Sequence, residues 1–285
     1  MSWQILALAS LIGTSSMILI QRSLLRQQKY DALAYAVFFL VIADIFTLAY
    51  AIINPSKSSA PVPYLNIAIS ITLYSIIEFL FFRSLKLVPA SIFIILFATR
   101  VVWTALISIP VLHESLNVVQ ILGAVLVLAA VYFINPIRHG AVKFNKGTKM
   151  ILLTAFLSGI AFANDAAAVR GGFSVPLYLV AVTGGPAIVV MLVQPSVLQK
   201  IKPLFKNSVF IKTALLTGFL QAFQSIAIYL AYQRAHNATV LAMLNQFQVV
   251  LIVLGGIILL GEREHIKRKL TATAIGFVGL ILLVI

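Results

Sequence analysis

The sequence predicts an all-α integral membrane protein with ten transmembrane helices, arranged as two inverted five-helix repeats. Its 285 residues are 61% hydrophobic and only 10% charged, whereas a soluble domain usually carries about 25% charged residues. Apolar runs of about 18 residues or more recur along the whole chain. The basic residues lie almost entirely between these runs, so the net charge of +14 indicates membrane flanks rather than nucleic-acid binding.

Ten apolar spans are expected to be helices, because only a helix satisfies its own backbone polar groups within hydrocarbon. About 20 residues, at about 1.5 Å each, cross a bilayer core of about 30 Å. In the first half the spans are Trp3–Ile20, Ala32–Ile53, Tyr64–Phe82, Ala90–Leu112 and Asn117–Ile134. In the second half they are Met150–Ala167, Ser174–Val193, Lys212–Tyr232, Ala238–Leu260 and Leu270–Ile285.

The chain divides nearly in half at a polar linker. We predict a first repeat over 1–134, an inter-repeat loop over 135–149 and a second repeat over 150–285. Aligning Glu114 with Glu262 places Arg100 opposite Gln248. Because five is an odd number of spans, the second copy must enter the membrane from the opposite side, and the repeats are expected to be inverted.

A short motif precedes the last helix of each half: Leu112-His113-Glu114 and Leu260-Gly261-Glu262. With the small residues that open the preceding helix, it resembles the EamA family of the drug/metabolite transporter superfamily. The resemblance implies secondary transport of a small metabolite, by export or exchange, through a central cavity between the repeats. Enzymatic activity is not expected. From the residues alone, Glu114 and Glu262 are expected to cap the helices that follow them.

The distribution of charge predicts the orientation. Connections after odd-numbered spans, counted together with Lys212 at the edge of the eighth span, hold 17 Lys and Arg residues, and those after even-numbered spans hold 3. By the positive-inside rule both termini are therefore extracytoplasmic. We expect a multi-pass protein of a bacterial or archaeal plasma membrane, a monomer or homodimer, whose partners are the lipid bilayer and a small-molecule substrate.

Arg100 is the first candidate for substrate binding. It lies near the middle of its span, where an arginine that faced lipid would cost several kcal/mol. Phe97 and Trp103 share its expected helical face, which resembles the wall of a cavity. The alternative is that Arg100 pairs with Glu78 or Asp44 and locks helices together. The other substrate-binding candidates are polar residues at membrane depth: Tyr74, Gln221, Asn245 and Gln248.

Three carboxylates within spans are candidates for proton coupling: Glu78, Asp165 and Asp44. An intramembrane acidic residue often belongs to a proton relay or an ion path. The sequence carries no cysteine, phosphate-binding loop, metal-ligand cluster or catalytic triad, so we expect no catalytic residue, metal or cofactor. The rival readings are a lipid-handling protein embedded in the membrane and a structural subunit that transports nothing.

Overall fold

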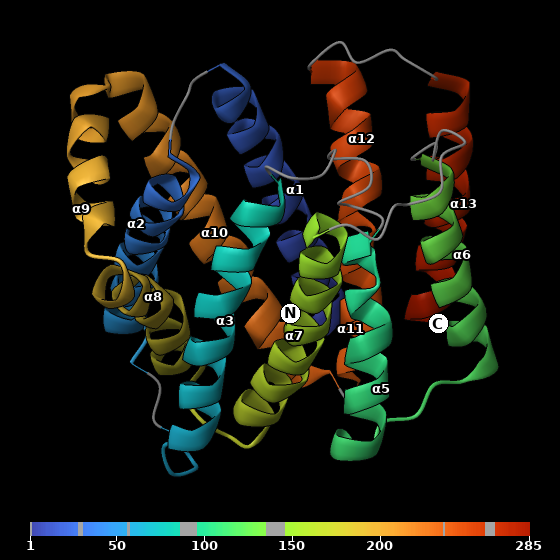
Figure 1. Cartoon of the computed structure of the whole chain (residues 1–285). Helices are drawn as coiled ribbons and strands as arrows, with labels where there is room; N and C mark the ends of the chain where they lie inside the picture. The colour runs from blue at the N-terminus through green and yellow to red at the C-terminus, as the bar shows by residue number, and fades with distance from the viewer. Residues whose placement is uncertain are drawn as a thin grey trace. The chain divides into compact units, whose positions relative to one another are not determined.

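The computed structural model describes residues 2–27, 31–55, 58–85, 96–134, 146–235, 237–259 and 266–285. These ranges form helices joined by short connections, and they contain no strand (Figure 1). The prediction of an all-α fold is confirmed. The family motif residue Glu262 lies outside the described residues.

The helices follow the expected spans closely. The first half contains α1 (Trp3–Gln27), α2 (Ala32–Ile53), α3 (Tyr64–Leu85), α5 (Arg100–Leu112) and α6 (Val118–Ile134). The second half contains α7 (Lys146–Arg170), α8 (Val175–Val193), α9 (Ser196–Ile201), the 3-10 helix η1 (Lys202–Lys206), α10 (Ser208–Arg234), α11 (Ala238–Gln246), α12 (Gln248–Leu259) and α13 (Ile266–Val284).

Six of the described helices are long and apolar enough to cross a membrane. They are Trp3–Gln21, Leu33–Ile53, Tyr64–Phe81, Lys146–Arg170, Val175–Val193 and Ser208–Arg234. Four shorter apolar helices accompany them: Leu96–Leu112, Val118–Ala130, Ala238–Ile252 and Thr273–Leu283. Length and composition thus make the chain a multi-pass membrane protein.

The helices do not correspond one to one with the ten expected spans. The ninth span is interrupted at Phe247, where the backbone hydrogen bonds shorten from the i−4 to the i−3 spacing. The predicted connection between the seventh and eighth spans contains α9 and η1. Pro195 directly precedes α9 and Pro203 is the second residue of η1, and proline tolerates such positions at the start of a helix.

Contacts between residues group the chain into two units. Unit 1 comprises Met1–Phe79 and Asn164–Arg234, and unit 2 comprises Leu80–Ala163 and Ala235–Ile285. Each unit draws on both halves of the sequence. The division into repeats at residues 134 and 150 stays a prediction from the sequence.

In unit 1, α2 and α10 pack side by side in the same direction. The rings of Phe38 and Phe210 have centroids 5.3 Å apart, and those of Phe46 and Phe219 lie 5.6 Å apart two turns later. Between these pairs a Cβ built on Gly218 would lie 2.5 Å from Ile42 Cγ2. The residue numbers of the contacting positions increase together along both helices, so α2 and α10 are parallel.

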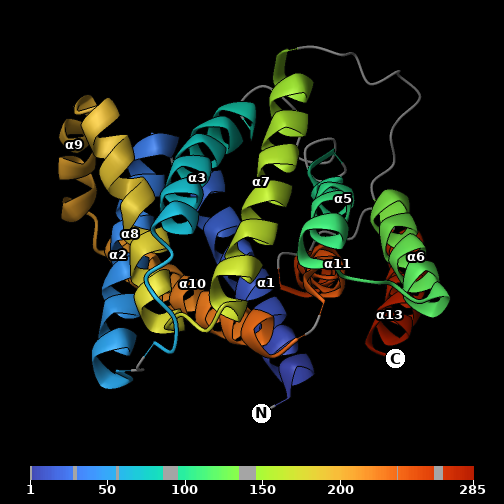
Figure 2. The ribbon, with the colours of Figure 1, turned by 90° about the horizontal axis from the view of Figure 1, so that it is seen from below.

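In unit 2, α6 and α13 are neighbours in both ribbon views (Figures 1 and 2). A Cβ built on Gly276 would lie 3.1 Å from Ala130 Cβ, and one built on Gly279 would lie 2.8 Å from the Gly123 carbonyl oxygen. One built on Gly123 would in turn meet Leu283 at 3.0 Å. The residue numbers of the contacting positions increase along α13 as they decrease along α6, so the two helices are antiparallel. Their glycines let the two backbones approach closely.

Glu114 caps a helix, but a different one from that expected. Its Oε1 accepts from the Ala238 amide at 2.5 Å, and its Oε2 accepts from the Thr239 amide at 3.0 Å and the Thr239 hydroxyl at 2.8 Å. These amides open α11, whereas α6, the helix after Glu114, is capped by Asn117. The carboxylate therefore reaches from the first half of the sequence to a helix of the second half.

Candidate functional site

Asp165 on α7 accepts hydrogen bonds from four hydroxyl groups. Its Oδ1 lies 2.5 Å from the Ser70 hydroxyl and 2.7 Å from that of Tyr178. Its Oδ2 lies 2.5 Å from the hydroxyls of Tyr74 and Tyr229. We call these four residues the Asp165 shell. The carboxylate is 1% exposed, and no basic side chain of the described residues lies within ion-pair distance of it.

The Asp165 shell connects four helices. Ser70 and Tyr74 lie one turn apart on α3, so both face α7. Tyr178 comes from the first turn of α8, which Ser174 caps, and Tyr229 comes from the last third of α10. An ionised carboxylate can only accept hydrogen bonds, at about four lone-pair sites. Four donors therefore match the ionised form of Asp165.

Two asparagine side chains extend this network along α3 and α7. Asn66 Nδ2 donates to Asn164 Oδ1 at 2.8 Å. Asn164 Nδ2 donates in turn to the Asn66 carbonyl and to the Ser70 hydroxyl, both at 2.9 Å. Ser70 thus contacts both the amide pair and Asp165. The result is a continuous polar path from the first turn of α3 to the buried carboxylate.

Glu78 and Asp44 have fewer partners. Glu78 is half-buried on α3, one turn after Tyr74, and has no hydrogen bond or ion pair within the described part of the chain. Asp44 Oδ1 accepts from the Thr47 hydroxyl at 2.9 Å. A Cβ built on Gly184 would lie 2.3 Å from Asp44 Oδ2, so the carboxylate needs glycine at that position of α8.

Arg100 is buried at the start of α5 in unit 2, with 8% of its surface exposed. Its guanidinium carbon lies 4.8 Å from the ring centroid of Phe97 and 5.2 Å from that of Phe162, within the range of a cation–π contact. Trp103 also packs on α7, the helix that carries Phe162, and its ring lies 5.2 Å from that of Phe156. Arg100 and Trp103 of the expected face therefore both lie against α7.

The remaining candidates belong to separate polar contacts. Gln221 Nε2 donates to the Ser225 hydroxyl at 3.4 Å. The neighbouring Gln224, whose Oε1 accepts from Ser10 at 3.3 Å and from Thr14 at 3.1 Å, ties α10 to α1. Asn245 and Gln248 are half-buried on either side of the break at Phe247. Their proposed contacts with substrate stay predictions.

Sequence reasoning selected Tyr74 and Asp165 but did not place them together, and it passed over Ser70, Asn164 and Tyr178. One signal was available. Polar residues stand at every fourth position of α3, namely Asn66, Ser70, Tyr74 and Glu78, and this spacing puts them on one helical face. The partners on α7 and α8 carry no such pattern, because contacts between helices leave no local spacing.

Multiple apolar helices around buried polar networks define the chain as an integral, multi-pass membrane protein. The first half of the sequence matches a particular family within this class. Residues 1–135 match the EamA-like transporter family, which belongs to the drug/metabolite transporter superfamily. The resemblance indicated by the sequence motifs is confirmed.

The fold recurs in solved structures. One crystal structure, described only as that of a protein, is similar over 98% of this chain and 95% of its own, with a TM-score of 0.78 and 16% sequence identity. At that identity the likeness concerns the fold alone. No curated protein matches the sequence.

Proposed function

We propose that this chain is a secondary transporter that moves a small metabolite by alternating access, as an exporter or exchanger. The observation that carries the proposal is a pair of matching backbone breaks. In the first half, the Thr99 amide donates to the Leu96 carbonyl at 3.2 Å, and the Val102 amide donates to the Thr99 carbonyl at 3.0 Å. Both bonds have the i−3 spacing.

The second half repeats this arrangement. The Phe247 amide donates to the Leu244 carbonyl at 3.0 Å, and the Val250 amide donates to the Phe247 carbonyl at 3.0 Å. Thr99 and Phe247 are separated by 148 residues, as are Glu114 and Glu262. A tightened turn within a helix often marks a hinge. Interrupted helices at corresponding positions of two halves are typical of transporters that rearrange around a central site.

The same correspondence supports ten spans in two inverted repeats, with each broken helix counted as one span. In such a chain the second and eighth spans run the same way and the fifth and tenth run opposite ways. The parallel pair of α2 and α10 and the antiparallel pair of α6 and α13 fit both requirements. The extracytoplasmic location of both termini stays a prediction from charge.

We further propose that transport is coupled to protons through Glu78. A proton on Asp165 would displace one of the four donors around that carboxylate, whereas a proton on Glu78 displaces none among the described residues. Glu78 also stands one turn from Tyr74, whose hydroxyl donates to Asp165, so the two carboxylates are linked along α3. Asp165 is then the fixed acidic centre and Glu78 the carrier.

Transport is tested with purified protein in liposomes. Candidate metabolites are selected by thermal stabilisation, because a bound ligand raises apparent stability by mass action. Each is then tested for counterflow and for uphill movement driven by a pH gradient. We expect at least one metabolite to move in counterflow. If no solute moves in either assay, the chain is not a transporter, and a structural or lipid-handling role replaces the proposal.

The coupling step is tested with Glu78→Gln. We expect this variant to retain counterflow, because glutamine keeps the size and polarity of the side chain, and to lose uphill transport driven by protons. Asp44→Asn is the matched control, since it also neutralises a half-buried carboxylate within a span, and it should retain both activities. Uphill transport by Glu78→Gln at the wild-type rate would exclude Glu78 as the carrier.

A further inference from the structure

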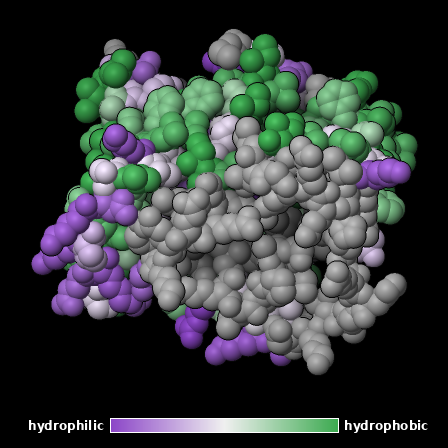
Figure 3. Space-filling view, turned by 90° about the horizontal axis from the view of Figure 1, so that it is seen from above, coloured by the Kyte–Doolittle hydropathy of each residue, from purple (hydrophilic) through white to green (hydrophobic). Residues whose placement is uncertain are grey.

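The connection between α8 and α10 is strongly basic. Lys200, Lys202 and Lys206 lie in α9 and η1, and Lys212 follows in α10, while no acidic residue stands between Gln194 and Lys212. Hydrophilic residues gather at the left edge of Figure 3, the side on which Figure 1 draws α9. The segment follows the end of one membrane-spanning helix at Val193 and precedes another at Ser208, so it lies at a membrane surface.

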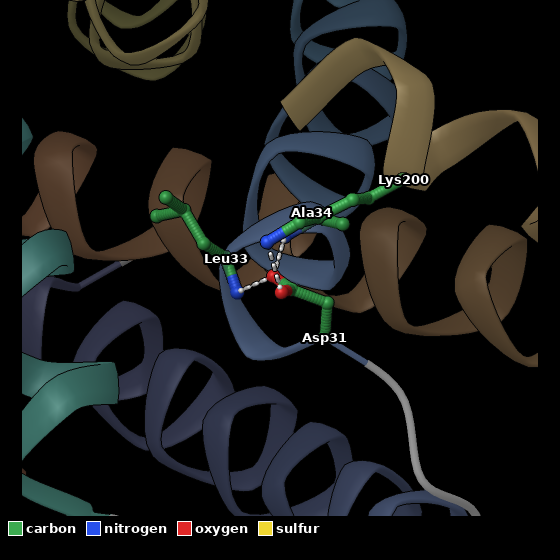
Figure 4. Close-up of polar contacts among 4 residues, drawn as sticks. All are labelled: Asp31, Leu33, Ala34 and Lys200. Atoms are coloured by element: carbon green, nitrogen blue, oxygen red, sulfur yellow. Dashed lines mark hydrogen bonds and ion pairs between the residues drawn. The ribbon is translucent and has the colours of Figure 1, made fainter. Parts of the chain in front are cut away.

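One side of this segment is anchored in unit 1. Val197, Ile201 and Leu204 have exposures of 1%, 8% and 5%, and they pack into the core that contains α2 and α10. Figure 4 shows Lys200 reaching Asp31 at the start of α2, where the Nζ–Oδ2 distance is 2.7 Å. The basic segment is therefore held in place and is not a loose loop.

The other side of the segment is exposed and carries both apolar and basic side chains. Leu198 and Phe205 are 47% and 61% exposed, although both are apolar. Lys202 and Lys206 are exposed as well, and neither forms an ion pair within the described residues. Exposed apolar side chains beside lysines are typical of a surface at the boundary between acyl chains and headgroups, where lysine stems lie along apolar surface and their ammonium groups reach the phosphates.

We infer that α9 and η1 form a docking surface for anionic phospholipids of the adjacent leaflet. Lys202 and Lys206 bind the headgroup phosphates, and Leu198 and Phe205 contact the upper part of the acyl chains. Lys200 serves the surface indirectly, because its ion pair with Asp31 fixes the segment. Charge complementarity selects the ligand: two cations that have no counter-ion among the described residues favour phosphatidylglycerol over zwitterionic phosphatidylcholine.

The test compares lipid binding by native mass spectrometry, with the full-length protein titrated separately with phosphatidylglycerol and phosphatidylcholine. The probe variant is Lys202→Gln/Lys206→Gln. The control variant, Lys146→Gln/Lys149→Gln, removes the same charge from exposed lysines of the first turn of α7. One lysine near an anionic membrane surface contributes about fivefold in affinity. The probe variant should therefore bind phosphatidylglycerol about 25-fold more weakly, while the control stays within about twofold of wild type.

Three results would overturn the inference. The first is equal loss in probe and control variants, which would indicate an effect of net charge alone. The second is wild-type binding that does not weaken with added salt, although exposed charges are screened over about 10 Å at 0.1 M. The third is equally strong competition by soluble glycerol phosphate, which would indicate a free-anion site. Charge reversal with Lys202→Glu/Lys206→Glu should weaken binding further, and a smaller loss than with glutamine would count against the inference.

Discussion

Replacing Asp165 by asparagine perturbs four hydrogen bonds with the change of one atom. The asparagine oxygen can keep two of the four donors, but its amide nitrogen donates and cannot accept, so two hydroxyl groups of the Asp165 shell lose their acceptor. Each buried donor left unsatisfied costs about 1–3 kcal/mol. We therefore expect Asp165→Asn to lower the free energy of unfolding by about 2–6 kcal/mol.

Two variants calibrate this value. Tyr229→Phe removes one donor and leaves the carboxylate with three, which should cost about 1.5–3 kcal/mol, the contribution of a hydrogen bond to a charged group. Asp44→Asn affects a carboxylate that accepts from a single side-chain hydroxyl and should cost about 1 kcal/mol. The measurement is helix unfolding in detergent, followed by circular dichroism. If Asp165→Asn unfolds at the wild-type temperature, or at a higher temperature than Asp44→Asn, the four-donor description of this site is wrong.

Three further predictions concern other parts of the fold. Glu114→Gln leaves one oxygen for three donors at the start of α11 and should lower the free energy of unfolding by about 1.5–3 kcal/mol for each lost bond. Glu114→Asp, whose carboxylate is on a shorter side chain, should recover little of this stability, and thermal unfolding measures both variants. Gly279→Leu forces a side chain against the Gly123 carbonyl and should cost more than the about 1–3 kcal/mol typical of overpacking. Gly171→Ala, whose built Cβ meets nothing closer than the Ala168 carbonyl oxygen at 3.4 Å, should be nearly neutral in the same assay. Burial raises the pKa of Asp31, but the hydrogen bond from Lys200, the α2 amides and the Lys200 charge together hold that pKa below its ordinary value. A lowered pKa contributes stability above the ordinary value, about 3.9, that is lost as the pH falls through the folded value. The stability difference between wild type and Asp31→Asn should thus shrink in acid; a difference that stays constant from pH 7 to pH 3 would contradict this assignment.

The helices could be predicted from the sequence because the membrane imposes them. An apolar run such as Ala32–Ile53 has no alternative to a helix in hydrocarbon, and α2 has the same bounds as the predicted span. The break at Phe247 was not predicted, because neither glycine nor proline marks it. It depends on how the two helix segments pack, and that information is distributed over distant residues.

The candidate site could be predicted only in part from the sequence. Acidic residues at membrane depth are rare enough to be noticed singly, so Asp165 and Glu78 were selected. The tyrosines that surround Asp165 come from three different helices and are ordinary residues in each. Glu114 was expected to cap the next helix, because a local motif describes only neighbours in sequence. The helix that it caps, α11, instead begins at Ala238, 124 residues later.

The reach of Glu114 and the closeness of Gly123 to Gly279 also bear on whether the two halves of the chain can be separated. A cut between the halves would leave one fragment holding the cap and the other holding the helix start that needs it. Each fragment would also expose its own side of the glycine contact between α6 and α13. The two halves of the chain, produced separately, would therefore complete these contacts only as a pair.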